Sequence, residues 1–239
     1  MSDVFNHGPH RETGNGGPCS AIRAIIPALE KDLGGVAVRR LLPADTLKSL
    51  GPFVFFDHLG PTYFPPGTGI DVRPHPHIGL ATVTYLFEGE ILHRDNLGNV
   101  QPIRPAEINW MTAGGGIVHS ERTPPALRES GQVVHAVQLW VDLPEEIEET
   151  NPSFSHYDAH QLPTIDGDGI ALRILLGEAF GVSSPVKTCS PTLYFEARIE
   201  KGAVLALPDR VEERAVYVVS GLIETRNTAI PQYCMAAFT

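Results

Sequence analysis

Short apolar runs separated by turn residues extend through most of the chain. The 239 residues include 23 glycines and 21 prolines, which are scattered and so indicate turns and not low complexity. Runs rich in aromatic and β-branched residues occur at 36–42, 53–58, 80–88, 90–95, 108–112 and 133–143. A helical period is scarce, and the best helix candidates are the short segments 44–50 and 125–130. The sequence therefore predicts an all-β protein with few short helices.

Composition and charge exclude several classes of protein. Hydrophobic residues make up 42% and charged residues 19% of the chain, as in globular proteins and unlike disordered ones. The net charge of −10 argues against direct nucleic-acid binding, because neutralising phosphates requires a basic surface. The apolar runs are far shorter than the roughly 20 residues of a membrane-spanning helix. Because the N-terminal residues show no secretory signal and the three widely spaced cysteines form no disulfide framework, a cytoplasmic location is expected.

The chain shows signs of two similar parts. Residues 1–18 are polar and glycine-rich, which predicts a flexible arm, and the acidic, proline-bounded stretch 144–160 is typical of a linker. This leaves an N-terminal domain at 19–143 and a C-terminal domain at 161–239. The segment 82–91 resembles 214–223 at an offset of 132 residues. Two copies of one β unit explain this match, and a chance match between two strand–turn–strand segments is the alternative.

Two short histidine motifs suggest a metal site. His75-Pro76-His77 places two imidazoles at i and i+2, and His119-Ser120-Glu121 does the same with an imidazole and a carboxylate. On an extended strand such side chains point to one face. Two such pairs on neighbouring strands of a barrel would bring three nitrogens and one oxygen together, a set that suits a divalent first-row transition metal. An octahedral ion would keep two positions open, as catalytic metals do.

These motifs resemble those of the pirin family within the cupin superfamily. The resemblance extends from about residue 20 to about 235 and rests mainly on residues 55–60 (Phe-Phe-Asp-His-Leu-Gly), 73–79 (Arg-Pro-His-Pro-His-Ile-Gly) and 109–121, which end with His119-Ser120-Glu121. The glutamate of the general cupin motif is absent, because Ala81 and Thr82 stand at its two expected positions. Pirins instead place the carboxylate two residues after the third histidine.

The resemblance implies a bicupin, with two jelly-roll β-barrels and one metal in the N-terminal barrel. It assigns His75, His77, His119 and Glu121 as ligands of one iron(II) ion. Ligand types alone leave Mn, Ni, Cu and Zn open. At the repeat offset, His75 and His77 correspond to Leu207 and Asp209, so the C-terminal copy has lost its ligands. Only 18 residues follow Gly221, and the C-terminal barrel is therefore expected to be truncated.

The resemblance also implies two kinds of function. One is a quercetin 2,3-dioxygenase activity, in which a flavonol reacts with O₂ and Glu121 acts as catalytic base as well as ligand. The other is a non-enzymatic, redox-sensitive regulator that binds a transcription factor or a metabolic enzyme. A degenerate cupin with a structural or adventitious metal is a third interpretation. His58, His93 and His135 lie in the same domain, either supporting the ligands or serving as structural histidines.

Overall fold

The computed structural model describes residues 19, 21–33, 36–209 and 211–238, so the arm expected at 1–18 lies outside it. The chain forms two compact units. Residues Leu29–Gln161 make up one, called here the central unit. The terminal unit combines the residues up to Ala28 with those from Leu162 onwards.

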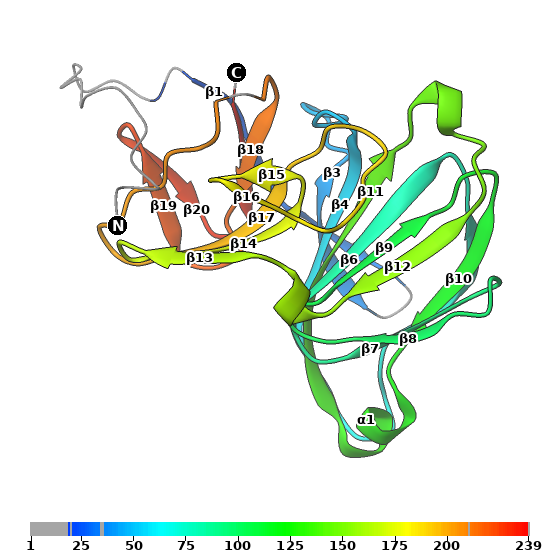
Figure 1. Ribbon diagram of the computed structural model, residues 1–239. Coiled ribbons are helices and arrows are strands. Elements are labelled where there is room, and N and C mark those ends of the chain that lie inside the picture. The colour runs from blue at the N-terminus through cyan, green and yellow to red at the C-terminus, as the bar shows by residue number, and fades with distance from the viewer. Residues whose placement is uncertain (1–18, 20, 34–35, 210, 239) are drawn as a thin grey trace. The chain divides into compact units, whose positions relative to one another are not determined.

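The central unit contains two sheets, one of seven and one of four strands (Figure 1). The seven-stranded sheet has the order β12-β9-β6-β11-β4-β3-β2, and the four-stranded sheet has the order β5-β10-β7-β8. The elements are β2 (Leu29–Asp32), β3 (Ala37–Leu42), β4 (Phe53–Phe64), β5 (Asp71–His77), β6 (Leu80–Glu88), β7 (Ile91–Asp95), β8 (Val100–Ile103), β9 (Ile108–Thr112), β10 (Ile117–Arg122), α1 (Pro125–Ser130), β11 (Gln132–Asp142), η1 (Glu145–Ile147), β12 (Ser153–Tyr157) and η2 (Ala159–Gln161).

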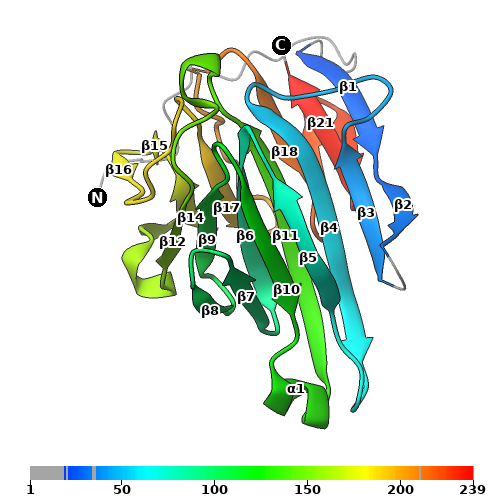
Figure 2. The ribbon, with the colours of Figure 1, turned by 90° about the vertical axis from the view of Figure 1, so that its right-hand side faces the viewer.

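The inner faces of these two sheets meet in the interior of the central unit. Strand β10 lies between β5 and β7 in the four-stranded sheet (Figure 2). Its Glu121 reaches across to Thr84 on β6, and the His93 ring of β7 stacks on Phe154 of β12. An apolar cluster fills another part of this interior; its buried members are Phe64, Ile70, Leu86, Ile91, Ile103, Val134 and Ala136. The space between the sheets is therefore apolar at this cluster and polar around β10.

The terminal unit is built from smaller sheets. Three strands pair in the order β1-β21-β18 and three in the order β13-β14-β17, with two further hairpins. The strands are β1 (Ile22–Pro27), β13 (Thr164–Gly167), β14 (Ile170–Leu176), β15 (Glu178–Ala179), β16 (Val182–Ser183), β17 (Tyr194–Ile199), β18 (Arg214–Tyr217), β19 (Leu222–Thr225), β20 (Thr228–Pro231) and β21 (Cys234–Phe238). Because β1 pairs with β21, it covers a backbone edge that would otherwise stay open.

The all-β prediction is confirmed, and one of the two helix predictions is wrong. Helix α1 spans the predicted 125–130, with proline at its first turn, where no backbone donor is needed. Residues 44–50 form no helix; the Ala44 amide donates to the Leu47 carbonyl at 2.8 Å, which is the opposite direction to a helical hydrogen bond. So short a segment gains little from helical hydrogen bonds unless a packed face stabilises it.

The repeated segments share their local structure. Segment 82–91 runs from β6 through Gly89 into β7, and segment 214–223 runs from β18 through Gly221 into β19. Both glycines have left-handed backbones, with φ of 86° and 77°. Leu207 and Asp209, the counterparts of the two histidines of β5, lie outside any strand. The match therefore extends to the turn and not to the neighbouring strand that carries the histidines.

Candidate metal centre

The two histidine motifs lie on adjacent antiparallel strands. His75 on β5 is the direct cross-strand partner of His119 on β10, and His77 lies two residues further along β5. A β-bulge between His119 and Glu121 shifts the register of β10 at this point. Strand pairing thus joins two same-face pairs that are 42 residues apart in the sequence.

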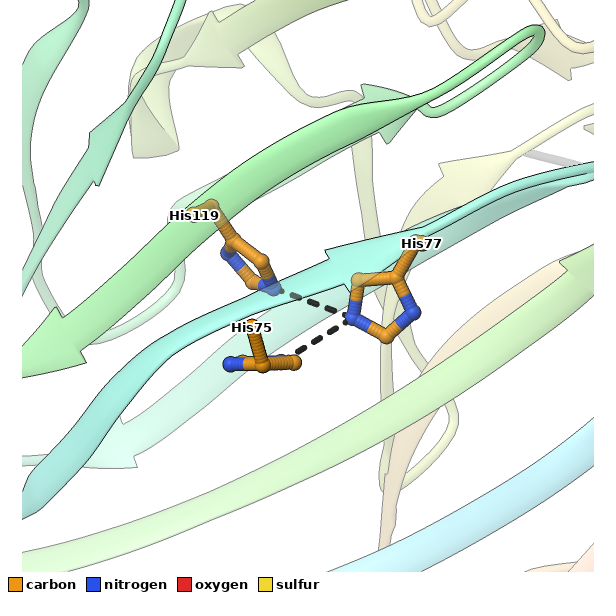
Figure 3. Close-up of side chains that lie close together, drawn as sticks. All are labelled: His75, His77 and His119. Carbon is orange, nitrogen blue, oxygen red and sulfur yellow. Dashed lines mark hydrogen bonds between the residues drawn. The ribbon is translucent and has the colours of Figure 1, made fainter.

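Three imidazole nitrogens converge between these strands (Figure 3). His77 Nε2 lies 3.1 Å from His75 Nε2 and 3.1 Å from His119 Nε2. His77 and His119 are almost completely buried, at 7% and 2% exposure, and His75 is half-buried. A proton on His77 Nε2 could bond to only one of the other two nitrogens, whereas a cation can contact all three.

The hydrogen bond made by His75 Nδ1 determines which nitrogen of this ring carries the proton. His75 Nδ1 lies 2.8 Å from the Arg73 carbonyl oxygen, which can only accept a hydrogen bond. Nδ1 therefore holds the hydrogen, and the Nε2 lone pair of the neutral ring faces His77. This is the tautomer that a metal ligand needs.

A buried relay fixes His119 in the same way. Asp95 Oδ2 lies 3.0 Å from His93 Nε2, so His93 donates from Nε2 and presents an acceptor at Nδ1. His119 Nδ1 lies 3.4 Å from that acceptor, which places its hydrogen there and leaves Nε2 free toward the centre. Hydrogen bonds from the Leu97 and Asn99 amides and the Asn99 side chain hold Asp95 in place. Carboxylate–histidine chains of this kind orient metal ligands in many proteins.

The electrostatics of the centre keep the His77 and His119 imidazoles neutral. Burial and then the nearby His75 and His93 lower the pKa of His119 to about 3. Burial, His119 and His75 lower the pKa of His77 to about 4, although Glu121 acts in the opposite direction. Although burial raises the pKa of Asp95, hydrogen bonds from Asn99 and His93 outweigh it and hold that pKa below its usual value. Metals bind neutral imidazole, so this arrangement fits a divalent cation.

Glu121 lies close to His119 and His93. Its carboxylate, His119 and His93 offer ligand atoms that all lie within 4.8 Å of one another, as do those of His75, His77 and His119. Glu121 Oε1 is 3.0 Å from Thr84 Oγ1, whose hydroxyl is also 2.9 Å from Gln138 Oε1. The structure thus brings the three predicted histidines together and places Glu121 beside His119; that all four hold a metal stays a prediction.

Aromatic side chains form the wall beside His77. Trp140 meets the His77 ring edge-on at 5.0 Å, and Phe55 stacks on Trp140 at 4.0 Å. The Arg40 guanidinium lies 4.4 Å from the centre of the Phe55 ring and pairs with Asp57 at 2.7 Å. These contacts restrict the His77 and Trp140 side chains, and such rigidity favours a well-defined ligand geometry.

The structure separates the three additional histidines that the sequence singled out. His93 belongs to the relay behind His119, whereas His58 and His135 contact each other, with 2.7 Å between their Nε2 atoms. Sequence reasoning did not single out Asp95 or Thr84. His93-x-Asp95 has the same i, i+2 spacing on a strand as the two ligand motifs, and this spacing is the signal that could have identified Asp95.

Among the residues that the structure describes, no helix is long and apolar enough to span a membrane.

Comparisons with known proteins show which family the chain resembles. The family model named Pirin matches residues 35–141, which include all four predicted ligands. A Pseudomonas aeruginosa protein provisionally named a quercetin 2,3-dioxygenase is 42% identical over 174 residues, which are 73% of this chain and 53% of that protein. The chain therefore spans about half the length of that relative.

A solved structure and a closer relative extend these comparisons. The crystal structure of quercetin 2,3-dioxygenase from Acinetobacter baumannii matches with a TM-score of 0.79 and 31% identity, covering 90% of this chain and 71% of that one. This likeness confirms the predicted bicupin fold. A pirin-like protein from Caulobacter vibrioides is 47% identical over 220 residues, which are 91% of this chain and 76% of that protein. By its sequence and its fold, the chain belongs to the pirin family.

Proposed function

We propose that this chain binds one iron(II) ion through His75, His77, His119 and Glu121, and cleaves a flavonol of the quercetin type with O₂. The observation that carries the proposal is the convergence of three Nε2 atoms at 3.1 Å, with the other nitrogens of His75 and His119 bonded away from the centre. Three nitrogens and a carboxylate oxygen suit a divalent first-row metal. The names of the Pseudomonas and Acinetobacter proteins support the choice of substrate.

A metal held at this site would supply Lewis acidity, which lowers the pKa of a flavonol hydroxyl. The chain's own residues supply rigidity and a place for the proton. The Arg73 carbonyl and His93 hold the rings of His75 and His119, so little reorientation is needed when the site is filled.

Glu121 is the proposed base for the flavonol hydroxyl proton. Thr84 has one hydroxyl hydrogen but two acceptors, Glu121 Oε1 at 3.0 Å and Gln138 Oε1 at 2.9 Å. When Glu121 carries a proton on Oε1, it can donate to Thr84 Oγ1 while Thr84 donates to Gln138. The protonated carboxyl therefore has a ready acceptor, which suits a residue that takes up a proton during the reaction.

The test is O₂ uptake with quercetin by protein loaded anaerobically with iron(II). We expect stoichiometric O₂ consumption by the parent and none by His75→Ala or His119→Ala. Asp71→Asn is the matched control, because Asp71 lies on β5 but pairs with Arg128, 2.7 Å away. A parent that binds iron and consumes no O₂ would refute the enzymatic proposal. Equal turnover by both histidine variants would refute the ligand assignment.

The alternative is an iron-binding, redox-sensitive regulator that docks on a transcription factor or metabolic enzyme. Two exposed apolar residues favour it: Ile78, next to His77, is 69% exposed and Val118, next to His119, is 42% exposed. A partner bound there would contact the immediate chain neighbours of two ligands. Iron binding without O₂ uptake would favour this alternative over the dioxygenase. We propose a cytoplasmic location for the protein, whether it is an enzyme or a regulator.

A further inference from the structure

A second group of metal-binding side chains lies at the edge of the seven-stranded sheet. Glu107 precedes β9, His156 lies on the edge strand β12, and Asp158 follows that strand. One ligand atom from each lies within 4.8 Å of the others. None of the three belongs to the proposed iron site, and residues 107 and 156 are far apart in the sequence.

The distances within this group are those of ligands around one ion. His156 Nε2 lies 3.6 Å from Glu107 Oε2 and 3.4 Å from Asp158 Oδ1. Good N–H···O hydrogen bonds are shorter, at about 2.7–3.2 Å. Ligands at about 2.1 Å from a tetrahedral metal lie about 3.4 Å from each other. The contact with Asp158 is a long hydrogen bond, the contact with Glu107 is too long for one, and both distances fit two ligands of a shared cation.

Asn109 orients His156 for such a role. It is the cross-strand partner of His156, and its Oδ1 accepts from His156 Nδ1 at 2.7 Å. In the neutral ring this leaves the Nε2 lone pair facing the two carboxylates. Asn109 is only 3% exposed, and its Nδ2 has no hydrogen-bond partner within the described part of the chain. This buried donor requires an acceptor, which an ordered water would provide.

The charges of the group also favour a divalent cation. Glu107 is 9% exposed, and a carboxylate buried beside another carboxylate is costly without compensation. Glu107 Oε2 accepts from the Arg104 backbone amide at 2.8 Å, but the Arg104 guanidinium is paired with Glu90 at 2.8 Å. A proton on His156 balances one of the two negative charges, whereas a divalent ion balances both.

We propose that Glu107, His156 and Asp158 bind a second divalent transition-metal ion, of the Zn²⁺ or Mn²⁺ type. One imidazole and two carboxylates form a harder ligand set than the three histidines of the iron site. The ion joins the start of β9 to the edge strand β12 and to the turn after it. It therefore stabilises an edge that has no further strand to pair with in this sheet. The proposal does not depend on the function proposed for the iron site.

The test counts metal equivalents on chelator-treated protein dialysed against Zn²⁺, and separately against Mn²⁺. We expect two equivalents on the parent and one on His156→Ala and on Glu107→Gln, which preserves side-chain size. His75→Ala should lose the other equivalent, so that His75→Ala/His156→Ala binds none. His160→Ala is the matched control, because this exposed histidine lies 4.0 Å from Asp158 outside the ligand group.

A second measurement separates metal binding from a folding defect. In the His75→Ala background, Zn²⁺ should raise the melting temperature, because a ligand that binds only the folded chain stabilises it. Adding Glu107→Gln should abolish this rise while the metal-free melting temperature changes little. Identical equivalents on the parent and on both second-site variants, or a Zn²⁺-induced rise that survives Glu107→Gln, would overturn the proposal and leave an ordinary ion pair.

Discussion

The central unit contains two groups of neighbouring histidines, which differ in their hydrogen bonds. At the candidate iron site, His77 Nε2 lies 3.1 Å from the Nε2 atoms of both His75 and His119, whose protons are held outward. His58 and His135 instead bring two Nε2 atoms to 2.7 Å, the distance of a hydrogen bond with one proton between them. The partner of the outer nitrogen decides whether an imidazole faces its neighbours with a lone pair or a hydrogen.

Burial does not distinguish the two groups. It is the main cause that lowers the pKa of His58 to about 3, as it is for His119. His58 follows Asp57 on β4, so the two side chains point to opposite faces of the strand. Phe87 packs against both rings of the second group, and its ring centre lies 4.6 Å from that of His135. Burial keeps His58 and His119 neutral alike, yet only the first group offers converging lone pairs.

The largest expected effect is the loss of metal at the first group alone. His77→Ala should remove the metal equivalent assigned to the three histidines, because it deletes the nitrogen that lies 3.1 Å from both others. His58→Gln should retain that equivalent. Metal analysis after dialysis, with circular dichroism as the folding check, measures both. A His77→Ala protein that keeps its full metal content would contradict the ligand assignment.

The second prediction concerns the pH dependence of the metal-free protein. Burial keeps His58 neutral in the fold, while the unfolded chain takes up a proton below its ordinary pKa of 6.5. Stability is therefore complete above that pH and declines as the pH falls toward the folded pKa of about 3. Between pH values of about 6.5 and 4, the parent should lose roughly 3 kcal/mol more unfolding free energy than His58→Gln.

Urea unfolding across this pH range provides the measurement. His160→Gln is the control for the loss of a histidine, because its side chain is 80% exposed. Parallel slopes for the parent and His58→Gln would show that His58 takes up its proton as readily in the fold as in the unfolded chain.

The third prediction is that Asp95→Asn reverses the hydrogen-bond directions of the relay behind His119. In Asp95→Asn, an amide nitrogen facing His93 Nε2 would donate where the carboxylate accepts. His93 would then carry its hydrogen on Nδ1 and move that of His119 to Nε2, which faces the centre. Metal affinity should fall by roughly 10- to 100-fold, as for other outer residues of metal sites. Asp71→Asn on β5 should have no such effect, and equal affinities in a competition with a chelator would refute the relay.

The smallest expected effect lies at the histidine pair. Phe87→Leu removes a ring that packs 4.6 Å from His135, so the unfolding free energy should fall by about 1 kcal/mol. Affinity for the metal at the three histidines should not change, because the Phe87 ring packs against Tyr85, His58 and His135. Thermal unfolding and metal titration on the same variant decide this, and a weaker metal site would show that the two histidine groups are coupled.

The sequence alone determined the local parts of this protein. The two-residue period of a strand places His75 with His77, and His119 with Glu121, whatever the strands pair with. Proline at the first turn positions α1, and the glycines of the repeated segments predict the turns at Gly89 and Gly221. The pirin resemblance depended on the same local motifs.

Tertiary structure alone decided which of these parts meet. The pairing of β10 with both β5 and β7 placed His119 between His75 and the His93–Asp95 relay. The pairing of β12 with β9 brought His156 to Glu107 from within a stretch that the sequence marked as a linker, and that of β1 with β21 joined the two ends of the described chain. Side-chain periodicity acts over a few residues, whereas strand pairing depends on burying faces and satisfying backbone hydrogen bonds across the whole fold.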